Sequence, residues 1–422
     1  MIHFSCGGFI EMMEYNTLDD VSVEEKTVLL RVDFNMPLDK KTFAILDITR
    51  MNRVIPTLEE LSNKKAKTVI LAHQGRQGSW DFIDLSNHAK TLENLLQKPV
   101  HFIDDIHGEK ALSAIKSLQP GECLLLDNVR KLSYETDKKS AEEHAETPFI
   151  KDLSSVADVF VNDAFAAAHR KQCSLIGFTA TLPSCAGRLM EKEITTLTKI
   201  VKSPEKPSVF LFGGAKFSDM IVTLERLLQN STADTILLTG LPANAFLKAK
   251  NVHLGQENEQ ALLEEGSQEQ FDEINQLLDK YPNHIHLPVD FAIEDEGMRK
   301  EITLEDLPSN KPLFDIGPET IHIYKEMLGK AKTIFLSGPC GVFENQLFMK
   351  GTKELFTYVS TLDAFSIVGG GHTVAAVKQL DLEQQMSHIS TGGGSLEKFM
   401  MREKLPVIEA LKEAKKKYVV TR

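Results

Sequence analysis

Residues 366–399 read SIVGGGHTVAAVKQLDLEQQMSHISTGGGSLEKF, a stretch in which one pattern occurs twice. A short apolar run, first at 365–368 and then at 388–389, leads into three consecutive glycines and from there into a segment that can form a helix. Glycines let backbone N–H groups approach a ligand closely, and a helix that starts there directs free N–H groups and a positive dipole end at it. Two such turns in succession predict a floor that holds oligophosphate anions, and hence a phosphoryl-transfer site.

Apolar strands and helical segments alternate along the rest of the chain as well. Strands are expected at 27–35, 67–73, 100–103, 123–126, 156–161, 209–212, 235–238, 284–288 and 333–336. A turn followed by a helix is expected at 47–63, and helices at about 84–97, 108–117, 183–202 and 218–229, of which 183–202 is the best candidate for a helix that links two domains. This alternation is typical of doubly wound parallel sheets whose two faces are both covered by helices.

Length and composition limit the class of protein. A chain of 422 residues is too long for one typical core and predicts more than one domain. The formal net charge of −12 argues against nucleic acid as the main partner, and no apolar run is long enough to cross a membrane. Five widely spaced cysteines without a CxxC pair predict reduced thiols in a cytoplasmic protein. The start of the chain is a poor secretory signal, and we interpret it as an extension or as residues before a true start at Met12 or Met13.

Four predicted strands of the first half end in polar side chains. The ends carry Arg31, Asp33 and Asn35; His73 and Arg76; Asn128 and Arg130; and Asn162 and Asp163 followed by His169 and Arg170. Any one of these basic groups could be an ordinary solvated surface charge. Because ligands of open α/β sheets bind at the carboxyl ends of strands, their recurrence at one edge, together with Arg50, predicts a basic cluster for a small, multiply charged anion. The histidines of this half show no metal-ligand spacing, and we predict no metal there.

A glycine turn also follows the first strand of the second half, where Gly213 and Gly214 lead to Lys216. A lysine just inside such a turn can reach a phosphate as a point charge, although it could equally be a surface lysine. The chain has no GxxxxGK[ST] sequence, no GxGxxG in the required context, and no HExxH, GxSxG or protein-kinase motif set. These absences exclude a P-loop enzyme.

In their order and spacing, nine segments resemble phosphoglycerate kinase, most closely its archaeal branch. They are RVDFNMPL, AHQGR, DNVR, VNDAFAAAHR, FGGAKFSD, DIGPET, SGPCGVFE, VGGGHT and STGGGSLE. No single segment is specific, but nine in order are, and the resemblance runs from about Leu18 to the C-terminus. It implies a cytoplasmic, bilobal enzyme that interconverts 1,3-bisphosphoglycerate plus ADP with 3-phosphoglycerate plus MgATP.

The resemblance also implies how the chain is divided. The expected fold is α/β, with two doubly wound, Rossmann-like parallel-sheet domains separated by a cleft and joined by a linker helix. The parts are an extension at 1–17, a phosphoglycerate-binding domain at 18–182, the linker helix at 183–202, a nucleotide-binding domain at 203–404 and a tail at 405–422. The tail is expected to fold back onto the first domain, and a frayed basic tail is the alternative.

Residues that match the family's motifs carry over as site residues. Phosphoglycerate binding is implied for Asp33, Asn35, Arg50, His73, Arg76, Arg130 and Arg170. Nucleotide binding is implied for Gly213, Lys216, Gly338, Glu344, Gly369, Gly370, Gly371, His372 and Thr373. Catalytic roles are implied for Arg50, Lys216, Gly371 and Gly394. The attacking carboxylate needs no general base, because a carboxyl group has a pKa of about 4, so positioning and charge neutralisation by these groups and Mg²⁺ should carry the reaction.

Three positions depart from the pattern of many family members. His372 stands in place of the aspartate that holds Mg²⁺, Met220 in place of a lysine and Ser337 in place of an asparagine. Histidine is a poor Mg²⁺ ligand, so two possibilities stay open: phosphate oxygens and water hold the ion, or another carboxylate substitutes. Archaeal-like members share such changes, and we expect an active enzyme.

Two other functions fit parts of the pattern. The basic cluster fixes the charge of the acceptor better than its carbon skeleton, so one alternative is a related kinase that acts on another phosphorylated carboxylate. The other is a catalytically silent nucleotide-binding homologue, which the change at His372 favours and the retained Arg50 and Lys216 oppose. We expect a monomer or a weak homodimer, with neither nucleic acid nor membrane as a partner.

Overall fold

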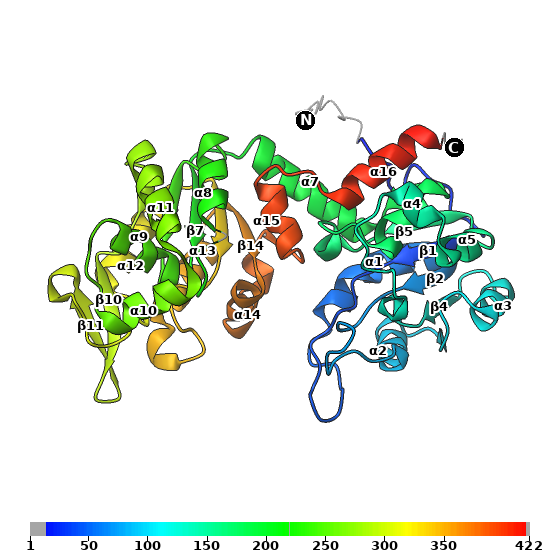
Figure 1. The fold of residues 1–422 in the computed structure, drawn as a ribbon, viewed down its shortest axis with the longest axis horizontal. Helices are drawn as coiled ribbons and strands as arrows, with labels where there is room; N and C mark the ends of the chain where they lie inside the picture. The colour runs from blue at the N-terminus through cyan, green and yellow to red at the C-terminus, as the bar shows by residue number, and fades with distance from the viewer. Residues whose placement is uncertain (1–13, 219, 419–422) are drawn as a thin grey trace, which may run out of the picture. The chain divides into compact units, whose positions relative to one another are not determined.

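The fold is that of a computed structural model, which describes residues 14–218 and 220–418. The chain divides into two compact units (Figure 1). Unit 1 holds the described residues up to Ile194 and again from Lys404 onward, and unit 2 holds Thr195–Glu403. The chain therefore passes between the units twice. Met12 and Met13, the two suggested start positions, lie outside the described residues.

Unit 1 is built on a six-stranded parallel sheet with the strand order β3-β4-β2-β1-β5-β6. Its strands are β1 (Thr27–Arg31), β2 (Lys67–Leu71), β3 (Val100–Ile103), β4 (Cys123–Leu126), β5 (Val159–Asn162) and β6 (Ser184–Ala186). Its helices are α1 (Thr49–Asn63), α2 (Ser86–Leu96), α3 (Glu109–Ser117), α4 (Ala141–Ala145), α5 (Pro148–Ser154), α6 (Cys173–Ile176), the start of α7 (Arg188–Lys202) and α16 (Pro406–Lys417). Short 3₁₀ turns are η1 (Val129–Lys131), η2 (Phe165–Ala167) and η3 (Gly177–Ala180). The predicted doubly wound parallel sheet is confirmed.

Both faces of this sheet are covered. Successive residues of a strand point to opposite sides of the sheet, and the residues of each side lie in a buried core. Val28 and Leu30 of β1 pack in one core with Leu58 of α1. Leu29 lies in the core of the other face with Phe149 of α5. Because both faces of the sheet are buried, polar groups can be placed at the ends of the strands.

Unit 2 repeats this architecture with a parallel sheet of order β15-β14-β13-β7-β8-β9. Its strands are β7 (Ser208–Phe212), β8 (Thr235–Leu238), β9 (Ile285–His286), β13 (Thr333–Ser337), β14 (Phe365–Gly369) and β15 (His388–Ile389). Its helices are α8 (Met220–Gln229), α9 (Gly240–Ala249), α10 (Gln256–Glu265), α11 (Gln268–Lys280), α12 (Pro318–Leu328), α13 (Lys350–Ser360), α14 (Gly371–Gln379) and α15 (Gly394–Met400). The 3₁₀ turns are η4 (Leu304–Asp306), η5 (Gln346–Phe348) and η6 (Glu383–Gln385). Each triple-glycine run thus leaves a strand and enters a helix, as predicted.

A three-stranded antiparallel sheet in unit 2 is missing from the sequence-based expectations. It has the order β11-β10-β12 and consists of β10 (Asp290–Asp295), β11 (Met298–Thr303) and β12 (Asp315–Ile316) (Figure 1). The last of these strands lies within the segment DIGPET. Glu296 and Gly297 connect β10 to β11 with positive φ at both residues, the geometry of a two-residue hairpin turn. Glu-Gly is a weaker turn signal than Asn-Gly or Asp-Gly, which is why the hairpin went unpredicted.

Helix α7 begins at Arg188, not at Pro183 as predicted. Residues 184–186 form β6 instead, because they pair with β5 and complete the sheet. The side chain of Asp163, directly after β5, accepts hydrogen bonds from the Met190 amide at 2.9 Å and from the Thr57 hydroxyl at 2.6 Å. The carboxylate therefore caps the start of α7 and joins it to α1.

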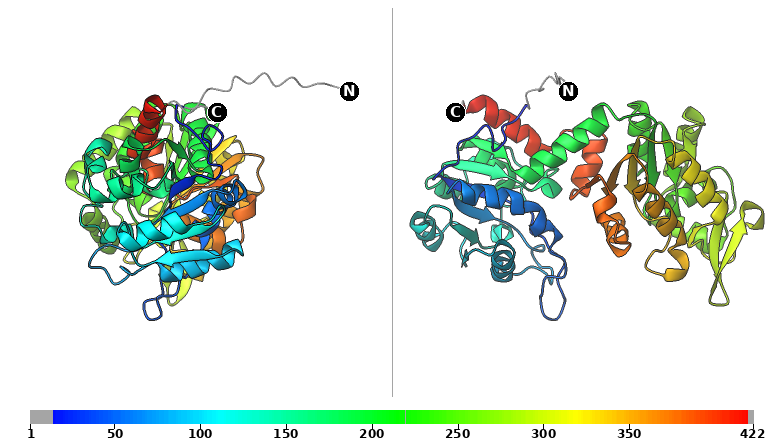
Figure 2. Two further views of the ribbon diagram at one scale, coloured as in Figure 1. Left: turned by 90° about the vertical axis from the view of Figure 1, so that its right-hand side faces the viewer. Right: turned by 180° about the vertical axis from the view of Figure 1, so that it is seen from behind.

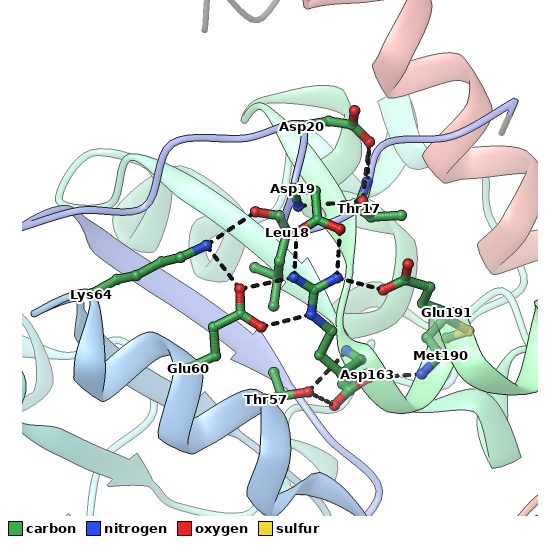
Figure 3. Close-up of polar contacts among 11 residues, drawn as sticks. Thr17, Leu18, Asp19, Asp20, Thr57, Glu60, Lys64, Asp163, Met190 and Glu191 are labelled. Atoms are coloured by element: carbon green, nitrogen blue, oxygen red, sulfur yellow. Dashed lines mark hydrogen bonds and ion pairs between the residues drawn. The ribbon is translucent and has the colours of Figure 1, made fainter. Parts of the chain in front are cut away.

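The first turn of α7 is also held by ion pairs (Figure 3). The Arg188 guanidinium contacts carboxylates of Asp19 at 2.6 Å, Glu60 at 2.6 Å and Glu191 at 2.8 Å. Glu60 lies on α1, so the guanidinium ties two helices and the segment before β1 together. This end of α7 is fixed to unit 1.

The C-terminal segment of the chain is part of unit 1. Helix α16 packs against β6, α6 and η3, where Figures 1 and 2 show it in red. The Val407 amide donates to the Ala168 carbonyl at 3.2 Å, and the Tyr418 hydroxyl donates to the Ala180 carbonyl at 2.9 Å. The end of the predicted tail, 419–422, lies outside the described residues.

Two further features concern the environment of the chain. No helix in the described ranges is long and apolar enough to span a bilayer. The thiols of Cys123, Cys173, Cys185 and Cys340 are free and buried.

Candidate active site

The carboxyl ends of β1, β2, β4 and β5 lie at one edge of the unit 1 sheet. Arg31 pairs with both Leu71 and Asn162, and Ile70 pairs with Leu125, so the segments that follow these strands start at the same level. Neighbouring strands are about 5 Å apart. The side chains of four segments are therefore within reach of one another, and these segments carry the predicted basic residues.

Asp33 lies in the segment after β1, which Asn35 joins to the segment after β2. Its Oδ1 accepts hydrogen bonds from the Arg50 guanidinium at 2.8 Å and from the Asn35 amide at 3.0 Å. The side-chain oxygen of Asn35 in turn accepts from the Gly75 amide at 2.9 Å. Burial alone would raise the pKa of the Asp33 carboxyl, but the positive charges and the hydrogen bond around it lower that pKa to about 2. Asp33 is thus a carboxylate that positions one cation of the cluster.

His73 is buried among cations. Its Nδ1 lies 3.1 Å from a terminal guanidinium nitrogen of Arg31, which is fully buried; the sequence placed Arg31 in the basic cluster but not among the residues implied to bind phosphoglycerate. Burial is the largest cause that lowers the pKa of His73 well below its ordinary value. Arg31, Arg130 and Arg170 lower this pKa further, and the carboxylate of Asp33 opposes them. These mutual effects place the five groups in one electrostatic cluster.

Arg130 carries a hydrogen-bond donor that lacks an acceptor. One of its terminal nitrogens donates to the Gly75 carbonyl, whereas its buried Nε has no partner among the described residues. Burial and the like charges of Arg170 and Arg31 lower the pKa of Arg130 to about 10. A buried, unpaired N–H beside other cations is unfavourable until an anion supplies acceptors. The arrangement fits a multiply charged anion.

Two residues after β2 differ from the expectation. Arg76 is exposed, and no hydrogen bond within the described ranges joins its side chain to the cluster; its amide donates to the Ser79 hydroxyl at 3.0 Å. Gln74, absent from the predicted site, is fully buried. Its side chain accepts from the Met36 amide at 2.8 Å and donates to the Met36 carbonyl at 3.1 Å, which fixes the segment after β1. The sequence offered one indication that Gln74 belongs to this site, namely its position between histidine and glycine in AHQGR.

In unit 2, the glycine turns after β7 and β13 interlock. The Gly213 amide donates to the Ser337 carbonyl at 2.8 Å, and the Gly214 amide donates to the Pro339 carbonyl at 2.8 Å. A Cβ on Gly213 would collide with the Pro339 carbonyl, and one on Gly338 would collide with the Gly213 carbonyl. Gly213 and Gly338, both predicted to bind nucleotide, are therefore already required to be glycine by packing.

The turns after β14 and β15 are open. Gly370 has a φ of 88° and precedes α14, whose first residue is Gly371. A Cβ on Gly371 or on Gly393 would meet no atom within 4 Å, and neither residue has positive φ. At Gly371 glycine is thus required neither by positive φ nor by packing, and at both positions the missing side chain leaves room where a ligand can approach. Gly369 differs, since a Cβ would collide with a leucine of α15, and Gly394 is the first residue of that helix.

The remaining predicted nucleotide residues are of two kinds. Lys216, Glu344 and His372 are exposed. Thr373 is buried, and its hydroxyl accepts from the Gly338 amide at 2.6 Å. Thr373 thus holds the β13 turn against α14, a structural task that its place after the glycines did not reveal.

The described residues contain no group of three or more His, Cys, Asp or Glu side chains that could hold a metal ion. His372, at the position in question, is exposed on the first turn of α14.

The similarity to known proteins extends over both units of the chain. A family model described as phosphoglycerate kinase matches residues 18–403. The phosphoglycerate kinase of Methanothermus fervidus is 44% identical over 406 residues, which cover 96% of this chain and 99% of that protein. The chain belongs to the phosphoglycerate kinase family. The phosphoglycerate kinase of Methanobacterium bryantii is 45% identical over 405 residues, again 96% of this chain and 99% of the relative.

Solved structures of phosphoglycerate kinases agree with this. The crystal structure of the Pyrococcus horikoshii enzyme matches with a TM-score of 0.88 and 39% identity, over 96% of this chain and all of the other. The Coxiella burnetii phosphoglycerate kinase matches with a TM-score of 0.81 and 33% identity, over 94% of this chain and 99% of the other. The predicted family, fold class and activity are confirmed. The chain is a phosphotransferase that exchanges a phosphoryl group between 1,3-bisphosphoglycerate and ADP, and the two alternative functions are set aside.

Proposed function

We propose that unit 1 binds the phosphoglycerate and unit 2 the nucleotide. The proposed phosphoglycerate ligands are Asp33, Asn35, Arg50, His73, Arg76, Arg130 and Arg170. The observation that carries this assignment is the unpaired, buried Nε of Arg130 in a cluster of like charges. Arginine suits this task because its planar fork matches carboxylate and phosphate oxygens. Arg76, which stands apart from the cluster's hydrogen bonds, is free to reach an anion from the solvent side.

For the nucleotide we propose the turns that follow β7, β13, β14 and β15. The backbone N–H groups at Gly370, Gly371 and His372 would face the phosphates at the start of α14, and Glu344 would lie near the ribose. The contacts described above shape this nucleotide-binding surface; they involve Gly213, Gly338, Gly369 and Thr373. The space left at Gly371 and Gly393 supports this division.

The chemistry asked of these residues is positioning and charge stabilisation. In the direction of ATP use, a carboxylate oxygen of 3-phosphoglycerate forms a bond to the γ-phosphorus, and the bond from that phosphorus to the ADP oxygen breaks. The carboxylate is ionised at neutral pH, so no proton has to be removed. We propose that Arg50, Lys216 and the N–H groups at Gly371 and Gly394 stabilise the charge on the transferring phosphoryl group.

We further propose that Mg²⁺ arrives with the nucleotide, held by phosphate oxygens and water. The exposed His372 and the absence of a three-ligand group among the described residues support this. When bound, Mg²⁺ neutralises charge on the phosphates. We also propose that the enzyme works in the cytoplasm as a monomer or weak homodimer; the four free, buried thiols are compatible with a reducing compartment.

Calorimetric titration and coupled kinetics on two variants test the division of labour. Arg130→Met should raise the Kd of 3-phosphoglycerate by about ten- to a hundredfold, through loss of charge-assisted hydrogen bonds, and leave the Kd of MgADP within about twofold. Lys216→Ala should lower kcat by about a hundred- to a thousandfold with little change in the Kd of 3-phosphoglycerate. Arg226→Met, which removes one exposed arginine from α8, is the matched control and should change neither.

Two results would contradict the proposal. One is an unchanged affinity for 3-phosphoglycerate in Arg130→Met. The other is near-normal kcat in Lys216→Ala.

A further inference from the structure

The contact between Arg31 and His73 determines where the imidazole can carry its proton. A guanidinium has only N–H donors and no acceptor. The ring nitrogen that faces it at 3.1 Å, Nδ1 of His73, must therefore be the acceptor and cannot carry a proton. A neutral imidazole with a bare Nδ1 has its proton on Nε2.

The guanidinium itself is held in place by a chain of buried groups. Its Nε donates to the Ser174 hydroxyl at 2.8 Å, and that hydroxyl donates to the carboxylate of Glu135 at 2.6 Å. The Ser174 amide donates to the other oxygen of Glu135 at 2.8 Å. Arg31 and Glu135 are both fully buried, so their charges compensate each other out of contact with solvent.

We propose that Arg31, held by Ser174 and Glu135, is a positioning residue that keeps His73 neutral with its proton on Nε2, so that Nε2 donates a hydrogen bond to the bound phosphoglycerate anion. The proposal rests on the assignment of His73 to the phosphoglycerate site. Arg31, Ser174 and Glu135 then contribute to substrate recognition, although none of them needs to touch the substrate.

The other charged groups that face His73 agree with this state. Asp33 is the one carboxylate among them, and Arg31, Arg130 and Arg170 are the cations, which together with burial keep the pKa of His73 low. An imidazolium would also bring a proton on Nδ1 against the guanidinium of Arg31. Substrate binding should consequently show no step from this histidine between about pH 6 and 8.

Nitrogen NMR on the intact enzyme labelled with ¹⁵N-histidine tests the proposal without reference to activity. The two-bond correlations of His73, assigned with His73→Gln, should show a bare Nδ1 and a protonated Nε2. Both signals should stay constant between about pH 6 and 8, whereas the same histidine in the urea-unfolded chain should titrate. A proton on Nδ1, or titration of His73 in the folded enzyme over that range, would overturn the proposal.

A paired set of variants then tests the role of Arg31. The double substitution Arg31→Met with Glu135→Gln removes the donor and the buried charge together. In the same NMR experiment its His73 should show both tautomers, because no donor then faces Nδ1, and its KM for 3-phosphoglycerate should rise by about threefold or more, because part of the population presents a bare Nε2 to the anion. Glu135→Gln alone keeps the guanidinium donor and should retain the wild-type tautomer and pH profile.

The two measurements separate the possible failures. If the double variant does not fold, the tautomer of the wild type still decides the proposal. If the double variant folds and its His73 keeps the wild-type tautomer, Arg31 does not control His73. An unchanged Kd for 3-phosphoglycerate in His73→Gln would refute the assignment of His73 to the site and leave the NMR result unaffected.

Discussion

Gly213 and Gly371 belong to the same predicted nucleotide site, but each position is glycine for a different physical reason. At Gly213 the neighbouring backbone occupies the place of a side chain, whereas at Gly371 that place is empty. The sequence presents both as phosphate-binding glycines. Only one of them has no role in holding the fold, and that one can be probed without unfolding the protein.

Alanine at each position should separate these roles. Gly213→Ala should lower the free energy of unfolding by about 1–3 kcal/mol or more, because its Cβ meets the Pro339 carbonyl. Gly371→Ala should leave the free energy of unfolding unchanged or raise it slightly, since alanine favours a helix. It should weaken MgADP binding by about tenfold, because the methyl group occupies the space left for the phosphates. Urea unfolding and calorimetry measure the two effects.

A stable Gly371→Ala variant with unchanged MgADP affinity would show that the space at Gly371 is not used by the nucleotide. An equally stable Gly213→Ala variant would show that the turn can move aside.

At the scale of elements, α7 is the helix along which the chain leaves unit 1. Asp163 caps the helix and the Arg188 guanidinium joins it to α1, the helix whose second residue is Arg50 (Figure 3). These contacts hold α1, which carries the proposed ligand Arg50, and the start of α7 together.

Removal of this guanidinium should be costly. Arg188→Met removes this cation from Asp19 and Glu191 and leaves Glu60 with Lys64 alone; the Glu60 and Glu191 side chains are only 22% exposed. We expect the free energy of unfolding to fall by about 1–3 kcal/mol. Arg226→Met removes an exposed arginine of similar size and should change it by less than about 0.5 kcal/mol. Urea unfolding followed by circular dichroism compares the two, and equal losses would mean that the ion pairs around Arg188 add nothing.

At the scale of the whole molecule, an acidic protein binds anions. The formal net charge is −12, yet the proposed phosphoglycerate site gathers arginines at one sheet edge. Local charge, not the total, therefore governs recognition. The chain has two units, each with its own sheet, and the proposed function places one ligand on each.

Hydrogen exchange tests this assignment across the whole enzyme. 3-Phosphoglycerate alone should slow exchange in the segments after β1, β2 and β4, and MgADP alone in the turns after β7, β13 and β14, because a ligand protects the amides that it orders. Protection of unit 2 turns by 3-phosphoglycerate alone would contradict the assignment. Sulfate at the same ionic strength serves as the control for a nonspecific anion effect.

The sequence alone determined the class of fold, the family and the edges where the polar groups gather. Periodic apolar runs fix which residues are buried, and strands that run parallel bring their polar ends together, so these results need only local information. The nine ordered segments fixed the activity.

Tertiary structure decided the rest, because it depends on which distant groups meet. The contact of Arg31 with His73, the task of Thr373 and the collision that reserves Gly213 for glycine join residues far apart in the chain. The hairpin β10–β11 and the late start of α7 likewise follow from strand pairing, which no single segment encodes. Only the packed chain shows that some glycines hold the fold while Gly371 leaves space beside it.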